Sequence, residues 1–192
     1  IKVKIIMLGD FYAGKSSLVR YFRLGIHASE QNFQPTIGIC VLNKFVDTVF
    51  EGKDIQLNLE IFDYALSDRK FKIQERYFAD AMGAICVFDL TNADTLPILA
   101  DSITQMAQIT PDAQMVLVGS KADLKDKCVV EQKQIDEIKE KYNCEYVQSS
   151  SSTGEGVIEC FNLMIQQIMK TDQFKQKVHA MLQEEKQLKQ CW

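Results

Sequence analysis

The stretch GDFYAGKS, residues 9–16, decides the fold class, because it matches the pattern G-x-x-x-x-G-K-[S/T]. An apolar run, residues 5–8, precedes it, and residues 16–24 follow with helical spacing. Two glycines let such a loop direct its N–H groups inward, and the following helix presents its positive N-terminal end to a polyphosphate. Lys15 then reaches the β- and γ-phosphates, and the Ser16 hydroxyl binds Mg²⁺. The stretch predicts a nucleotide-phosphate site; the alternative is an ordinary glycine-rich turn.

Strands and helices alternate along the rest of the chain. The expected strands are residues 5–8, 40–50, 54–63, 84–90, 115–119 and 145–148, and the expected helices are residues 16–24, 94–109, 131–142 and 156–170. The second and third strands flank a Glu-Gly-Lys turn, which predicts an antiparallel hairpin. The sequence therefore predicts an α/β fold: a six-stranded, mostly parallel sheet with one antiparallel strand and helices on both faces.

Composition bounds the class of protein. The 192 residues are 46% hydrophobic and 25% charged, with a net charge of −4, which excludes collagen-like and wholly disordered chains. The mild acidity disfavours a nucleic-acid partner, and no apolar run approaches the roughly 18 residues of a membrane span. The six cysteines lack metal-ligand or redox spacing, so we expect reduced thiols in a cytosolic protein. Because the chain begins at Ile1, just before a predicted strand, we expect it to be trimmed or part of a longer product.

Four later segments accompany the phosphate loop. They are FQPTIG at residues 33–38, Asp63 at the end of the third strand, SKAD at residues 120–123 and SSSSTG at residues 149–154. In this order the chain resembles the Ras superfamily of small GTPases, and specifically its Rab-like branch, over about residues 2–170. The most Rab-like stretches are TIGI at residues 36–39, YFADAMG at residues 77–83 and VFDLT at residues 87–91. The resemblance implies a small G domain of the P-loop NTPase type over residues 1–170.

The resemblance implies a site for GTP or GDP with Mg²⁺. Thr36 would complete the Mg²⁺ shell and sense the γ-phosphate, and Asp63 would hold a Mg²⁺-bound water. The implied nucleotide-binding residues are Gly9, Tyr12, Ala13, Gly14, Lys15, Ser16, Ser17, Thr36, Asp63, Ser120, Lys121, Asp123, Ser150, Ser151 and Ser152. The implied metal ligands are Ser16, Thr36 and Asp63, and the implied catalytic residues are Lys15, Thr36 and Ser67.

The resemblance also implies how guanine would be recognised. Asp123 would accept hydrogen bonds from the N1–H and the exocyclic amine of the base. Lys121 would lie along the base, and the N–H of Ser151 would read the guanine carbonyl oxygen. Taken singly, Asp123 could instead be a turn former, Thr36 a solvated loop hydroxyl and residues 149–152 a polar loop.

The second switch departs from the family pattern D-x-x-G-Q, because residues 63–67 read DYALS. Leu66 stands where a glycine meets the γ-phosphate, and Ser67 stands where a glutamine orients the attacking water. Phe11 and Tyr12 place two aromatic rings where the family loop has small residues. These departures predict weak hydrolysis.

The base loops depart as well. Ser120 replaces an asparagine and is expected to lose the tie between base loop and phosphate loop, and Ser152 replaces a lysine that packs on the base. The aromatic ring that covers guanine has only His27 or Phe33 as a substitute. A loss of two or three contacts at about 1 kcal/mol each would weaken binding about 10²- to 10³-fold.

Three functions follow from these residues. The first is a Rab-like switch in vesicle trafficking that hydrolyses GTP slowly, and the alternative is a catalytically inactive pseudo-GTPase that acts as an interaction module. A small-molecule P-loop kinase is disfavoured by the hairpin and by Asp123. Implied partners are exchange proteins, activating proteins and effectors, which would bind the switches near residues 29–38 and 64–78. An apolar patch of Val41, Phe62 and Tyr77 would add to the effector surface.

Residues 171–192 change character and form a helical or flexible tail. An apolar series recurs at roughly helical spacing among Lys, Gln and Glu residues: Phe174, Val178, Met181 or Leu182, and Leu188. This series predicts a poor core and a solvated helix or a docking segment. The last four residues do not form a C-a-a-X box, so lipidation is expected only at or beyond Cys191, if the chain continues. The expected location is cytoplasmic, and peripheral on endomembranes if lipidated.

Overall fold

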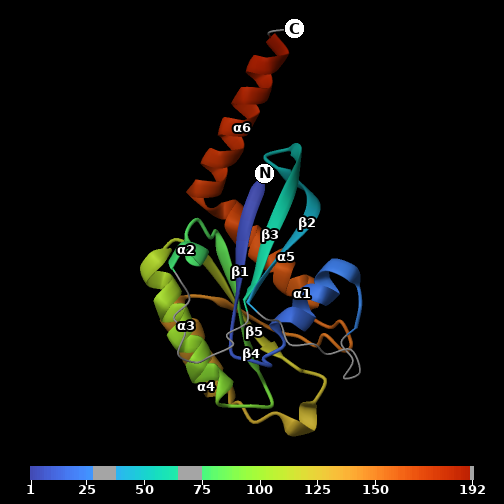
Figure 1. Ribbon diagram of the computed structural model, residues 1–192, viewed down its shortest axis with the longest axis vertical. Coiled ribbons are helices and arrows are strands. Elements are labelled where there is room, and N and C mark those ends of the chain that lie inside the picture. The colour runs from blue at the N-terminus through green and yellow to red at the C-terminus, as the bar shows by residue number, and fades with distance from the viewer. Residues whose placement is uncertain (28–37, 65–74, 191–192) are drawn as a thin grey trace.

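The computed structural model describes residues 1–27, 38–64 and 75–190 and contains a six-stranded sheet in the order β2-β3-β1-β4-β5-β6 (Figure 1). The strands are β1 (Lys2–Leu8), β2 (Ile39–Phe50), β3 (Lys53–Tyr64), β4 (Gly83–Asp89), β5 (Gln114–Ser120) and β6 (Glu145–Gln148). The β2–β3 pair is antiparallel, and the other strand pairs are parallel. The predicted sheet is therefore confirmed.

Helices cover both faces of this sheet, as predicted. They are α1 (Lys15–Leu24), α2 (Glu75–Phe78), α3 (Thr95–Ile109), α4 (Gln132–Tyr142), α5 (Val157–Lys170) and α6 (Asp172–Gln190), with a 3₁₀ turn at Lys125–Lys127. One core cluster packs α1, α5 and the start of α6 against the sheet, and Phe22 of α1 stacks on Phe161 of α5 at 3.7 Å between ring centroids. The second cluster packs α3 and α4 against the opposite face.

The second half of β1, residues 5–8, shows why a central strand carries a continuous apolar run. Ile5 and Met7 lie in the first core cluster, whereas Ile6 and Leu8 lie in the second, because alternate side chains of a strand point to opposite faces. A strand buried on both faces needs apolar residues at every position. β1 therefore lies in the middle of the molecule, and the loop that follows it opens at the carboxyl edge of the sheet.

The start of α6 differs from the expected solvated tail. Phe174 and Val178 are fully buried in the first core cluster, and the Phe174 ring lies 5.4 Å from Phe50 at the end of β2. The tip of the β2–β3 hairpin thus supplies an apolar partner that helical spacing alone could not reveal. The rest of α6 extends away from the domain (Figure 1).

The five cysteines in the described part of the chain carry free thiols, in agreement with the expected reduced state. Burial raises the pKa of the Cys144 thiol to about 11 and raises that of Cys86 well above its usual value, so these thiols stay protonated at neutral pH. Within residues 1–27, 38–64 and 75–190, no helix is both long and apolar enough to cross a bilayer.

Candidate functional site

The loop between β1 and α1 has the backbone shape that its two glycines predict. Gly9 has a φ of +143°, and a Cβ there would lie 2.1 Å from the carbonyl oxygen of Val87 in β4. Gly14 has a φ of +94° and stands at the N-cap of α1 without a side chain to cap it. The positive N-terminal end of α1 therefore faces the loop, where it would favour an anion.

Lys15 lies inside this loop, as the sequence predicts. Its side chain is buried, and Nζ donates hydrogen bonds to the carbonyl oxygens of Gly9 at 3.0 Å and Asp10 at 2.8 Å. Burial lowers the pKa of Lys15, while the charges of Asp63 and Asp10 act in the opposite direction. The loop thus holds a cation at its centre, where a polyphosphate would need one.

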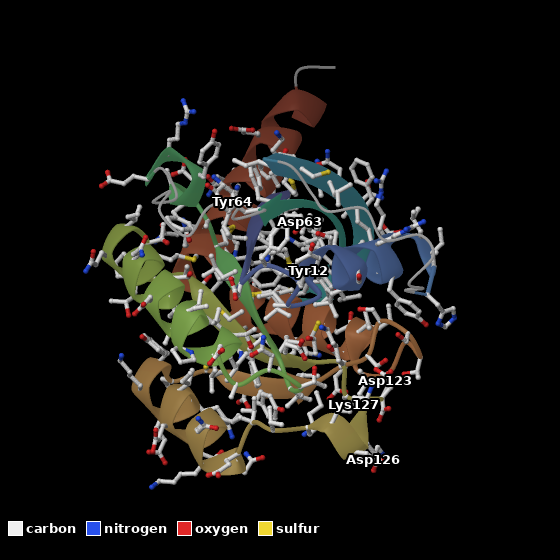
Figure 2. The ribbon with its side chains drawn as sticks, turned by 60° about the horizontal axis from the view of Figure 1, so that its bottom comes forward. Tyr12, Asp63, Tyr64, Asp123, Asp126 and Lys127 are labelled. Carbon is white, nitrogen blue, oxygen red and sulfur yellow. The ribbon has the colours of Figure 1, made fainter. Side chains whose placement is uncertain are left out.

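Asp63 reaches the same place from β3. The parallel register pairs Asp63 with Met7, so its buried carboxylate lies beside the end of β1 (Figure 2). Ser16 and Ser17 occupy the first turn of α1 and are half-buried. The hydroxyl of Ser16 and the carboxylate of Asp63 are the oxygen ligands that Mg²⁺ takes, and the glycine cradle fits a polyphosphate. These residues therefore fit a nucleotide with Mg²⁺.

Phe11 and Tyr12 form a small aromatic pair on the loop. Their ring centroids are 4.2 Å apart in an edge-to-face arrangement, and Tyr12 has a left-handed φ of +60°. The Tyr12 side chain is exposed, whereas Phe11 is half-buried. The rings therefore stand at the rim of the loop rather than inside its cradle.

Ser120 corrects an expectation from the sequence. We expected the serine in place of asparagine to lose the tie between base loop and phosphate loop, but its Oγ donates a 2.6 Å hydrogen bond to the carbonyl oxygen of Ala13. The short hydroxyl of Ser120 reaches the Ala13 carbonyl because the backbone at Gly14 lies close to Ser120. A Cβ added at Gly14 would lie 3.4 Å from Ser120 Oγ. Ser120 therefore links the two loops.

Replacing Ser120 with alanine is expected to destabilise the fold by about 1–3 kcal/mol, because the Ala13 carbonyl would be left buried without its donor. We also expect nucleotide to dissociate faster, since the two loops would separate more readily. Chemical denaturation and nucleotide-release kinetics measure these effects. Ser102→Ala is the matched control, since Ser102 is also buried and donates to a backbone carbonyl, that of Ile98, in α3. Equal release rates for both variants would show that Ser120 has no special role.

The sequence did not identify Asp89 as a site residue. Lys121, expected along the base, forms a 2.5 Å ion pair with Asp89 at the end of β4. Asp89 is 5% exposed and also accepts hydrogen bonds from the N–H and the hydroxyl of Thr91, at 2.8 and 2.7 Å. The VFDLT stretch was singled out only for its resemblance to the family, and Asp89 comes within reach of Lys121 because the parallel register pairs Asp89 with Ser120. Asp89 therefore anchors Lys121.

Asp123 lies shortly after Lys121 in the chain, and its side chain is exposed (Figure 2). Among the described residues, none forms a hydrogen bond with this side chain. The backbone around it is held firmly, because the N–H of Ala122 donates to Ser149 and the N–H of Ser149 donates to Gly119. A carboxylate on such a loop is available to a ligand.

The serine-rich loop after β6 is shaped by Ser150. This residue is fully buried, and its Oγ accepts hydrogen bonds from the N–H groups of Ser152 and Thr153 at 3.2 and 3.1 Å. Ser151 is half-buried and Ser152 is exposed. Ser150 thus orders the loop from within, and Ser151 and Ser152 face outward beside Asp123's loop.

His27 joins the end of α1 to the serine loop. Its Nδ1 lies 2.8 Å from the carbonyl oxygen of Ser152, and its ring meets that of Tyr21 edge to face at 5.1 Å. Tyr21 in turn packs on Gly154, where a Cβ would lie 2.0 Å from the tyrosine hydroxyl. His27 is exposed yet fixed in place near the predicted base site.

Several predicted residues lie outside the described part of the chain. They are Thr36 and Phe33 in the first switch, and Leu66 and Ser67 in the second. All three residues of the apolar patch are described: Val41 pairs with Phe62 across the hairpin, and Tyr77 lies 6.2 Å from Tyr64 between ring centroids. The Nζ of Lys4 lies 4.6 Å above the Phe62 ring.

The sheet order, the glycine cradle around Lys15 and the linked loops at the carboxyl edge define a small G domain. The chain belongs to the Ras family, whose family model matches residues 4–170. It is 28% identical over 186 residues to Ras-related protein Rab-27B of Bos taurus, covering 92% of this chain and 84% of that protein. It is 30% identical over 176 residues to Ras-related protein Rab-27A of Rattus norvegicus, covering 88% and 79%. The protein is therefore a GTP-binding switch of the small GTPase class.

Proposed function

We propose that this chain is a Rab-type guanine-nucleotide switch that acts in vesicle trafficking and hydrolyses GTP slowly. The observation that carries the proposal is the hydrogen bond from Ser120 to Ala13. It holds the loop that leads to Asp123 against the loop that contains Lys15. A site for the base and a site for the phosphates are thereby kept at a fixed spacing, as recognition of one nucleotide requires.

We propose that the phosphates are bound by the backbone amides of residues 12–17 and by Lys15. Ser16, Thr36 and Asp63 would hold Mg²⁺, which would offset the phosphate charge when bound. Because Lys15 Nζ is already fixed by two carbonyl oxygens, little side-chain entropy is lost when it meets a phosphate.

Guanine preference is proposed to rest on Asp123, whose carboxylate accepts from the N1–H and the exocyclic amine of the base. Adenine presents an acceptor at N1, so the carboxylate would face it without a donor. Lys121, anchored by Asp89, would lie along the base. The N–H of Ser151 would donate to the guanine carbonyl oxygen.

Slow hydrolysis is proposed because residue 67, the family position that orients the attacking water, is not a glutamine. In-line attack on the γ-phosphate requires a positioned water, and Ser67 is shorter than the glutamine of the family pattern. Leu66 would restrict the approach of the second switch. The ring pair of Phe11 and Tyr12 at the rim of the loop would crowd the same water and any arginine supplied by an activating protein.

Hydrolysis should be restored only by changes made together. Ser67→Gln leaves the rings in place, and Phe11→Gly or Tyr12→Gly clears space for a water that nothing orients, so each alone should help little. Combined with Leu66→Gly, they should raise the single-turnover rate about twofold to 100-fold beyond the product of the separate effects, because the groups act on one water. Phosphate release from a preloaded 1:1 GTP complex measures this. An unmodified chain that already hydrolyses GTP as fast as the combined variant would contradict the slow-hydrolysis proposal.

The alternative of a catalytically inactive interaction module is not favoured, because membership of the Ras family supports a working switch. The nucleotide released when the purified protein is denatured separates these functions. GTP indicates a slow switch, GDP indicates active hydrolysis, and the absence of nucleotide indicates an interaction module.

Effectors and regulators are proposed to bind the switch segments, residues 29–38 and 64–78, together with Val41, Phe62 and Tyr77. The register that pairs Val41 with Phe62 supports a joint surface. We further propose that residues 1–170 form the G domain and residues 171–192 an appended segment whose first turns pack on that domain.

A further inference from the structure

Strand β2 is a long edge strand that contains neither a bulge nor a proline. It is twelve residues long, lies at the end of the sheet, and pairs one-to-one with β3 from Ile39 opposite Tyr64 to Phe50 opposite Lys53. Natural edge strands are shortened, bulged, or guarded by proline or lysine, because their open backbone groups can pair with another chain. The one lysine of β2, Lys44, donates to the carbonyl oxygen of Phe22, so its charge is directed toward α1. Within the described ranges, no element pairs with the outer edge of β2.

One face of β2 carries exposed apolar side chains at regular spacing. Val41, Phe45 and Val49 are 47%, 64% and 59% exposed, and the polar residues Asn43 and Asp47 lie between them. Alternate residues of a strand share a face, so these five side chains form one row. The row is symmetric about Phe45: an apolar residue lies four positions away, and a polar residue two positions away, on either side.

We propose that β2 pairs antiparallel with β2 of a second copy of this chain, with Phe45 opposite Phe45 of the second copy. A twofold axis perpendicular to the sheet keeps both rows on the same face. Val41 then lies opposite Val49 of the second copy, and Asn43 lies opposite Asp47. Each apolar residue of the row meets an apolar partner, and each carboxylate meets an amide. The two sheets join into one continuous sheet.

Other symmetric registers match less well. Centring on Lys44 places two lysines opposite each other and Phe45 opposite Asn43, and centring on Val46 places Phe45 opposite Asp47. Centring on Asp47 brings two carboxylates together, which is destabilising. Centring on Asn43 matches Val41 with Phe45 but leaves Val49 beyond the paired residues. Only the register centred on Phe45 gives every residue of the row a partner of matching polarity.

A second copy is the occupant that this pattern favours. A strand donated by a different protein would need apolar residues at matching positions, but it would not require this row to be symmetric about its own centre. The row is symmetric in both its apolar and its polar positions, which makes it self-complementary, as an isologous interface must be.

Sedimentation of the full chain over a range of concentrations tests the dimer. We expect reversible dimers for the unmodified protein, and Phe45→Lys should weaken them about tenfold or more, because it removes an aromatic pair and opposes two positive charges. Ile158→Lys is the matched control, since Ile158 is also an exposed apolar residue, 46% exposed on α5. Nucleotide affinity should be the same in both variants, which separates a failed dimer from a failed nucleotide site. A chain that stays monomeric at every concentration, or equal weakening by both substitutions, would overturn the proposal.

Disulfide trapping tests the register. In a background of Cys40→Ser, Cys128→Ser and Cys191→Ser, with diamide as oxidant, Phe45→Cys should form cross-linked dimers by itself, because opposite Cβ atoms lie about 4.5–5.5 Å apart. Val41→Cys alone should not, but a mixture of Val41→Cys and Val49→Cys chains should. Equal cross-linking of Val41→Cys alone, or none in the Phe45→Cys chain, would overturn the register.

Discussion

Replacing Lys15 with alanine is expected to weaken binding of GTP about 10²- to 10⁴-fold, and binding of GDP, which lacks the γ-phosphate, about 10- to 10²-fold. Hydrogen bonds to charged groups contribute about 1.5–3 kcal/mol each, and Lys15 is proposed to serve both the β- and γ-phosphates. Its Nζ is buried at the centre of the loop, where no other described lysine makes the same contacts. Isothermal titration with GDP and Mg²⁺ measures the loss.

Lys177→Ala is the control for this variant, because Lys177 also donates to a backbone carbonyl, that of Lys2, but does so from α6. Thermal unfolding should show that the Lys15 variant is folded, so that lost binding reports the site. Unchanged titration curves for Lys15→Ala would contradict the phosphate-site assignment.

Replacing Asp123 with asparagine is expected to exchange base specificity. The amide cannot accept both hydrogen bonds from guanine, but it can donate one to the second carbonyl oxygen of xanthine. GDP affinity should therefore fall about 10²-fold or more while affinity for xanthosine diphosphate rises. Competition between the two nucleotides, followed by fluorescence, measures the exchange.

Asp126→Asn is the matched control, because Asp126 is an exposed acid of the neighbouring 3₁₀ turn (Figure 2). It removes the same charge from the same side of the molecule, so a general electrostatic effect would appear in both variants. Equal loss for guanine and xanthine nucleotides in Asp123→Asn would show that Asp123 does not read the base.

The sheet was predictable because its signals are local. Apolar runs ending at turn residues predict buried strands, and the Glu-Gly-Lys turn predicts the hairpin of β2 and β3. The start of α6 was not predictable in the same way. The burial of Phe174 depends on Phe50, which reaches it only when the hairpin lies beside α5 and α6.

The site likewise combines features that a local sequence signal predicts with features that depend on tertiary contacts. The positions of Lys15 and Asp63 follow from a motif and from the end of a strand. The contact between Ser120 and Ala13 joins residues 107 positions apart, and the ion pair of Lys121 with Asp89 depends on the parallel register of β4 and β5. A serine in place of asparagine therefore suggested a lost tie, although the tertiary structure restores one with a hydroxyl.

We propose that one site reads both the guanine base and the phosphates. The most direct measurement is competition for the purified chain, in Mg²⁺, between a fluorescent guanine nucleotide and unlabelled nucleotides. We expect GDP and GTP to displace the probe, whereas ADP and ATP should not at about 100-fold higher concentration, a difference of about 2.7 kcal/mol. Displacement by adenine nucleotides at the same concentrations as by guanine nucleotides would show that the site does not read the base.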